Sequence, residues 1–200
     1  MKHFTLLKAV LFIASLIPVL RLSWFAYSDQ LGANPIELIT RSLGTWTLVF
    51  LLITLSITPV RKLSGWAWLI KLRRMAGLFA FFYASLHFIT YIWLDQFFDF
   101  SSIYKDVIKR PFITIGFAAF VMLIPLAATS TNAMIKKLGG QLWQKLHRLV
   151  YLIAIFAVLH YWWLVKKDIT QPLIYAAVLT LLLVYRVWSR STQNKLAKQL

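Results

Sequence analysis

The chain contains no cysteine, and acidic residues are scarce, with six Asp and Glu against 22 Lys and Arg. The absence of cysteine excludes disulfides, iron–sulfur clusters, thiolate-bound zinc and cysteine nucleophiles within this chain. None of the acidic residues lies inside an apolar stretch, whereas pumps and ion-coupled transporters usually carry a carboxylate within the membrane. The missing residues therefore argue against thiol chemistry and against ion-coupled transport.

Hydrophobic residues dominate the composition. They make up 60% of the sequence, the mean hydropathy is +0.71 and charged residues make up 14%, whereas a soluble domain has about 25% charged residues. A helix needs about 17–25 apolar residues to cross a bilayer, and six such runs occur, at residues 9–27, 43–60, 75–94, 112–128, 147–165 and 172–188. The sequence therefore predicts an all-α integral membrane bundle of six transmembrane helices, forming a single domain over residues 1–200.

Basic residues lie between the apolar runs rather than on one soluble face, which argues against a nucleic-acid partner despite a net charge of +16. Four segments would lie on one side of the membrane: the two termini, the connection between the second and third runs, and the connection between the fourth and fifth. Fifteen of the 22 basic residues fall in or next to these four segments. All six acidic residues fall in the other segments. Because positive residues are retained in the cytoplasm, we expect cytoplasmic termini in a multi-pass protein of a bacterial inner membrane, in contact with membrane lipid.

Three histidines lie within the predicted spans: His87 in the third, and His147 and His160 at the two ends of the fifth. At 1.5 Å per residue, His87 lies about 18 Å from the cytoplasmic start of its span and His160 about 20 Å from that of its own. Two neutral imidazoles at one depth can bind opposite faces of a haem iron within an apolar bundle. Since such ligation leaves no position for oxygen, the pair favours electron transfer.

His147 is about 20 Å from His160 along the helix and points about 140° away from it, so the two cannot share one haem. A second, inner site is therefore incomplete, because the third span offers Arg73 or Arg74 at that depth and guanidinium is not an iron ligand. Arg74 and Arg148 could instead pair with haem propionates or a flavin phosphate. Contact with lipid phosphate and positive-inside anchoring explain these arginines equally well.

Two other interpretations of the histidines stay open. Zinc would bind imidazole, but a closed zinc site needs four ligands and neither carboxylate nor thiolate is available at that depth. The histidines could also form interhelical hydrogen bonds in a transporter or an assembly subunit without redox chemistry.

A family resemblance is carried by four segments, which are Ile57–Arg61, Arg73–Leu78 followed by Tyr83 and His87, Leu146–Tyr151, and His160–Tyr161. The chain resembles the ferric-reductase-like transmembrane domain and, within it, the haem-binding membrane subunits of periplasmic protein-methionine-sulfoxide reductases. In larger members of this superfamily, two helices each carry two histidines and hold two stacked haems. His87 and His160 match the outer pair and His147 one inner position, whereas Arg74 stands at the fourth, thirteen residues before His87.

The resemblance implies a non-catalytic electron-transfer subunit that holds one haem b on His87 and His160, with a second haem at His147 left open. It implies quinol or a cytoplasmic flavin reductase as the electron donor, and a periplasmic molybdenum-containing subunit that reduces methionine sulfoxide as the acceptor. FMN is also associated with the family, but no residue pattern here marks a flavin site. A free-standing ferric or quinone reductase is the alternative within the same chemistry. No Gly-x-Gly-x-x-Gly segment is present, so the chain needs a separate donor to use NAD(P)H.

Overall fold

The computed structural model describes residues 2–165 and 167–196, and within these ranges the regular structure is entirely helical. The elements in chain order are α1 (Lys2–Tyr27), α2 (Pro35–Ser64), η1 (Ala67–Leu72), α3 (Arg73–Thr90), η2 (Tyr91–Asp95), α4 (Phe100–Lys109), α5 (Pro111–Ala128), α6 (Asn132–Leu138), α7 (Gly140–His147), α8 (Leu149–Leu164) and α9 (Thr170–Leu196). The predicted single domain also includes residues 1, 166 and 197–200, which lie outside the described residues.

Six helical segments of the described chain are long and apolar enough to cross a membrane, which confirms the prediction of six spans. They are Phe4–Tyr27, Pro35–Ser64, Ala67–Asp95, Pro111–Ala128, Gly140–Leu164 and Thr170–Ser189. Helices suit an apolar solvent because they satisfy every backbone hydrogen bond within one segment. The sequence prediction therefore captures the number and order of the spans.

The helix α2 extends beyond its predicted apolar run at both ends, because a capping residue stops it on each side. The predicted span 43–60 lies within α2, which begins after Asn34, whose side chain accepts a hydrogen bond from the Glu37 backbone N–H. Its other end is set by Gly65, whose φ of 74° is in the left-handed region and costs a residue without a Cβ little. Hydropathy detects only the apolar middle of such a helix.

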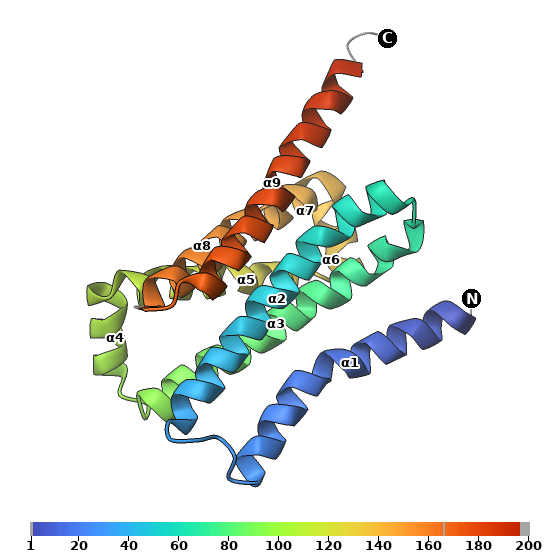
Figure 1. The fold of residues 1–200 in the computed structure, drawn as a ribbon. Coiled ribbons are helices and arrows are strands. Elements are labelled where there is room, and N and C mark those ends of the chain that lie inside the picture. The colour runs from blue at the N-terminus through green and yellow to red at the C-terminus, as the bar shows by residue number, and fades with distance from the viewer. Residues whose placement is uncertain (1, 166, 197–200) are drawn as a thin grey trace.

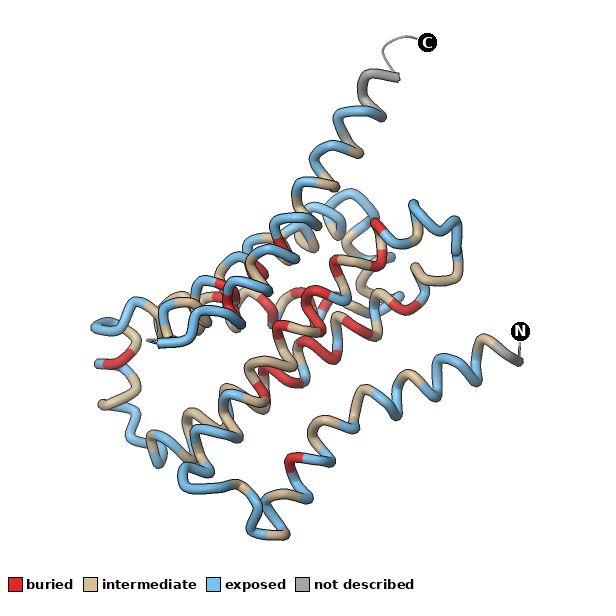
Figure 2. The backbone as a smooth tube through the Cα atoms, in the orientation of Figure 1, coloured by how far each residue is buried: buried red, intermediate tan, exposed pale blue. Residues whose placement is uncertain are grey.

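The core lies between α2 and α3, where most of the buried positions are found (Figure 2). Tyr83 of α3 is fully buried, and its ring stacks on Phe50 of α2 at 5.4 Å between ring centroids. The Tyr83 hydroxyl donates a hydrogen bond of 2.7 Å to the Ser15 carbonyl of α1.

By contrast, α1 runs at the edge of the bundle (Figure 1), and Leu22 is its only buried residue among those whose side chains are described. The Tyr83 hydroxyl thus makes a polar contact that joins α1 to the buried core.

The helices form two main pairs: α2 packs on α3, and α5 packs on α8. The start of α1 and the end of α9 lie toward one end of the bundle, and the short helix α4 lies at the opposite end (Figure 1). This arrangement agrees with six crossings, which place both termini on one side. Which side is cytoplasmic stays a prediction from the charge distribution.

Candidate functional site

His87 and His160 are brought together from different helix pairs. His87 lies on α3 and His160 on α8, and their ring centroids are 6.2 Å apart with the ring planes 76° to one another. The sequence predicted that the two histidines lie at one depth. The structure adds that their side chains also approach each other laterally, which the sequence alone could not show.

Each of these rings is held through its Nδ1 atom by a backbone carbonyl of a neighbouring helix. His87 Nδ1 lies 2.9 Å from the Thr40 oxygen of α2, and His160 Nδ1 lies 2.7 Å from the Phe112 oxygen of α5. A carbonyl oxygen can only accept, so Nδ1 carries the hydrogen in both neutral rings and the Nε2 lone pair is left available. Histidines that bind metals usually show this arrangement.

Both histidines line one cavity of about 590 Å³, a size within the range of about 300–1,000 Å³ that is usual for ligand pockets. Its walls in the middle of the bundle are mostly apolar, and include Leu48, Leu51, Ala84, Phe88, Phe120 and Ile153. Charged residues line it only where α2, η2 and α5 meet the α4 end of the bundle, and these are Glu37, Arg41, Asp95 and Arg110. The cavity therefore suits a large apolar group with polar substituents at one edge.

The donor set fits a haem better than zinc. A bond from imidazole nitrogen to a metal is about 2.0–2.1 Å long, so two rings on opposite sides of one ion have centres roughly 6 Å apart. The observed separation is 6.2 Å. In the described part of the chain, no group of three or more His, Cys, Asp or Glu side chains could hold a metal ion. A metal with only two protein ligands needs the others from elsewhere, and a macrocycle supplies four.

His147 lies apart from this pair, at the end of α7, and is held differently. Its Nε2 atom is 3.0 Å from the Thr129 hydroxyl oxygen, and that hydroxyl donates to the Pro125 carbonyl at 2.6 Å. The hydroxyl must therefore accept from His147, so that Nε2 carries the hydrogen. The indole ring of Trp143 stacks on the imidazole at 3.9 Å between centroids.

A second cavity, of about 540 Å³, is lined by His147 together with Arg74 and Arg148. The structure thus brings together the three inner residues that the sequence singled out. Lys62, Arg73 and Arg186 also line this cavity, and the described residues around it include no Asp or Glu. Excess positive charge near a membrane end favours an anionic group such as a carboxylate or a phosphate.

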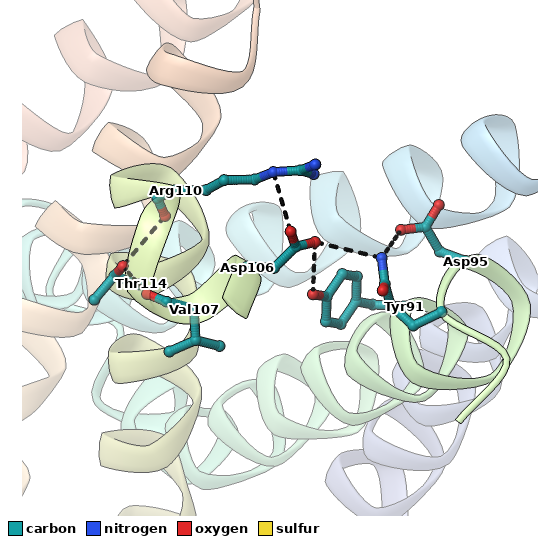
Figure 3. Close-up of polar contacts among 7 residues, drawn as sticks. Tyr91, Asp95, Asp106, Val107, Arg110 and Thr114 are labelled. Carbon is teal, nitrogen blue, oxygen red and sulfur yellow. Dashed lines mark hydrogen bonds and ion pairs between the residues drawn. The ribbon is translucent and has the colours of Figure 1, made fainter. Parts of the chain in front are cut away.

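Sequence reasoning missed a polar cluster at the α4 end of the first cavity. Asp106 of α4 is 8% exposed, and it receives Arg110 Nε at 3.1 Å, the Tyr91 hydroxyl at 3.3 Å and Gln96 Nε2 at 3.4 Å (Figure 3). Tyr91 and Arg110 also line the cavity that holds the histidine pair. The only sequence signal was the four-residue spacing of Asp106 and Arg110, which marks an ion pair on many exposed helices.

Comparison with known proteins agrees with the geometry. Residues 43–158 match the family described as ferric reductase like transmembrane component. The chain is similar to proteins named protein-methionine-sulfoxide reductase heme-binding subunit MsrQ, of which that of Herminiimonas arsenicoxydans is 61% identical, over 95% of this chain and 89% of its own. Those of Azospira oryzae and Ralstonia nicotianae are 53% and 52% identical, over 96% and 94% of this chain and 83% and 87% of theirs.

Proposed function

This chain belongs to the ferric reductase like transmembrane component family and to its protein-methionine-sulfoxide reductase heme-binding subunits, and from this premise we propose that it holds haem between His87 and His160 and delivers electrons to a reductase subunit. It is a multi-pass protein of the bacterial inner membrane, with six helices that can span it. The observation that carries the proposal is the histidine pair, 6.2 Å apart in one largely apolar cavity.

Neighbouring residues fix the protonation and the orientation of the two histidine side chains that would bind the iron. Haem, when bound, supplies one-electron redox chemistry. The Thr40 and Phe112 carbonyls hold a hydrogen on each Nδ1, which leaves each Nε2 unprotonated and fixes the orientation of the ring. The apolar walls keep water away from the pair. His87 and His160 would be the two protein ligands of the iron, and a haem held by both of them would serve electron transfer rather than oxygen binding.

The reduction itself takes place in a partner subunit. Conversion of a methionine sulfoxide to a thioether consumes two electrons and two protons and releases one water molecule. This chain has no cysteine thiol to supply them, so the catalytic centre belongs to the partner. We propose, on the family resemblance, that this partner is a periplasmic molybdenum-containing subunit, and that quinol or a cytoplasmic flavin reductase supplies the electrons.

We propose that the cavity lined by His147, Arg74 and Arg148 binds a further cofactor, one that carries carboxylate or phosphate groups. Arg74 and Arg148 would pair with the propionates of a second haem b or with the phosphate of FMN, and this is supported by the cavity that both line together with His147. Haem and flavin contents of the purified protein, measured for wild type and for Arg74→Gln, Arg148→Gln and His147→Ala, decide between the two. A cofactor content that none of the three substitutions changes would contradict the assignment.

The haem assignment is tested by absorption spectra of detergent-purified protein before and after dithionite. We expect the sharp reduced bands of low-spin haem in the wild type, their loss in His87→Ala and in His160→Ala, and their retention in the matched control His3→Ala. The control changes the same residue type ahead of the first span. A colourless wild-type protein, made with haem in ample supply, would return the histidines to a packing role.

A further inference from the structure

A glycine lies against each of the paired histidines. A Cβ added to Gly44 of α2 would lie 3.1 Å from Cε1 and 3.2 Å from Nδ1 of His87. A Cβ added to Gly116 of α5 would lie 2.7 Å from Nδ1 and 2.9 Å from Cε1 of His160, a separation that real Cβ atoms essentially never show. Each imidazole therefore occupies the space that any other residue type would fill.

The two glycines share one further relation to the histidines. Gly44 follows Thr40 by four residues and Gly116 follows Phe112 by four, and Thr40 and Phe112 supply the carbonyls that accept from the histidine Nδ1 atoms. In an α-helix the N–H of residue i+4 donates to the carbonyl of residue i. Each carbonyl is thus shared between the backbone of a glycine and an imidazole, and the missing Cβ lets the ring reach it.

This arrangement, a carbonyl that accepts from an imidazole and is followed four residues later by a glycine against the same ring, forms a seat for the ring. Among the described residues it occurs once in α2 and once in α5. Glycine is unfavourable inside a helix compared with alanine, so its presence at both seats calls for a local reason. Gly77 of α3 provides the contrast, because a Cβ there would lie 3.7 Å from Cγ2 and 3.9 Å from Oγ1 of Thr54, which are ordinary contacts.

We propose that Gly44 and Gly116 are positioning residues that set the planes of the two haem-binding imidazoles close to perpendicular. The observed angle between the ring planes is 76°. This inference rests on the proposed haem site. It adds that the site sets the electronic state of the iron, since the histidine ligands and their hydrogen bonds influence the properties of a haem.

The ring angle has a direct spectroscopic consequence. Each imidazole raises the iron d orbital that overlaps its π system, and parallel rings raise the same orbital, which separates the two dπ levels. Perpendicular rings raise both levels alike and leave them nearly degenerate. The ferric low-spin electron paramagnetic resonance signal then has a large maximal g value rather than the ordinary rhombic pattern.

The experiment is electron paramagnetic resonance of the oxidised, detergent-purified protein, with haem content measured on the same samples. We expect the large maximal g value in the wild type and a shifted value in Gly44→Ala and Gly116→Ala. The shift should be greater for Gly116→Ala, because its added methyl meets the ring at the shorter distance. Gly140→Ala is the control and should keep the wild-type signal, because an added Cβ there meets no atom within 4 Å and the residue lines neither cavity.

The possible outcomes separate this inference from the haem assignment. A wild-type protein with haem and an ordinary rhombic signal, or alanine variants with unchanged haem content and unchanged g values, would overturn the inference and leave the haem site intact. If Gly116→Ala fails to fold, the wild-type signal and the milder Gly44→Ala still decide. A wild-type protein without a His87-dependent haem signal would instead overturn the proposed function.

Discussion

His147 differs from the other two membrane histidines in the nitrogen that carries its hydrogen. In His87 and His160 the hydrogen is on Nδ1 and faces a carbonyl, whereas in His147 it is on Nε2 and faces the Thr129 hydroxyl. In His87 and His160, Nε2 therefore keeps a lone pair for a ligand, whereas in His147 it carries the hydrogen that is donated to Thr129. A ligand for His147 must approach Nδ1 or displace Thr129.

Thr129→Val tests how much the His147 contact contributes to stability. The variant keeps the volume of the side chain but removes the acceptor for His147 Nε2–H, and an unsatisfied donor in a buried site costs about 1–3 kcal/mol. We expect the lower part of that range, because His147 is only partly buried. The thermal midpoint in detergent should fall by about 2–4 °C per kcal/mol.

Ser130→Ala is the control for this experiment. The Ser130 hydroxyl, just after the end of α5, donates to the Leu126 carbonyl in the last turn of that helix, so its removal should leave the midpoint close to that of the wild type. Equal midpoints for Thr129→Val and Ser130→Ala would show that the contact between Thr129 and His147 adds no stability.

At the residue scale, the sequence predicted the depth of the histidines but not their partners. Depth follows from the constant rise of a helix, so counting from the start of a span was sufficient for His87 and His160. The partners Thr40 and Phe112 lie 47 and 48 residues away on other helices. No local rule links residues at that separation, although a glycine inside an apolar span was a signal that a neighbour approaches closely.

Among the elements, α4 is one of the short helices that hydropathy did not predict, and α6 is another. Helix α4 lies between two spans, where the sequence indicated only a polar connection. Asp99 caps its start by accepting from the Ser101 and Ser102 backbone N–H groups, and Asp106 attaches it to Tyr91. Short amphipathic helices of this kind escape a search for long apolar runs, because only one face is apolar.

Asp106→Ala should loosen α4 from the bundle. The substitution removes the acceptor shared by Arg110, Tyr91 and Gln96, and since Arg110 is more than half exposed, the loss is on the order of 1 kcal/mol. We expect faster amide hydrogen exchange across residues 100–109. Lys105→Ala, an exposed change on the same helix, serves as the control, and the idea fails if both variants exchange at the same rate.

The packing of α1 on the bundle depends on a hydrogen bond that is lost when a single oxygen atom is removed. Tyr83→Phe deletes the hydroxyl that donates to the Ser15 carbonyl, a change of about 0.5–1.5 kcal/mol, and α1 has little buried surface to compensate. Amide exchange within residues 10–22 should therefore rise. Tyr104→Phe, at a side chain that is 68% exposed, should leave it unchanged, and similar exchange in the two variants would argue against this role of Tyr83.

For the whole molecule, the side on which the termini lie is the main prediction left to test. The basic residues predict cytoplasmic termini, and the two ends of the described chain lie toward the same end of the bundle (Figure 1). A fluorescent protein fused after Leu196 should fluoresce, and alkaline phosphatase fused there should be inactive. Phosphatase inserted after Gln96 should be active, and the reverse pattern would invert the topology.

The overall architecture was largely predictable, whereas the two cavities were not. Six apolar runs determine six spans, because each must satisfy its backbone within the bilayer. A cavity depends on which helices become neighbours, and the pairing of α2 with α3 and of α5 with α8 leaves no periodic trace in the sequence. The inner arginines were identified as candidates because Arg73 or Arg74 stands at the depth of His147 and a guanidinium can pair with propionate or phosphate.

The division of the histidines between two helix pairs also has a consequence for biogenesis. His87 belongs to the pair α2 and α3, and His160, which follows it by 73 residues, belongs to the pair α5 and α8. A haem that needs both ligands cannot be captured while the nascent chain has delivered only its first half to the membrane. On the proposed ligation, haem would enter only after both helix pairs are in the membrane, and once bound it would link the two pairs of the completed protein.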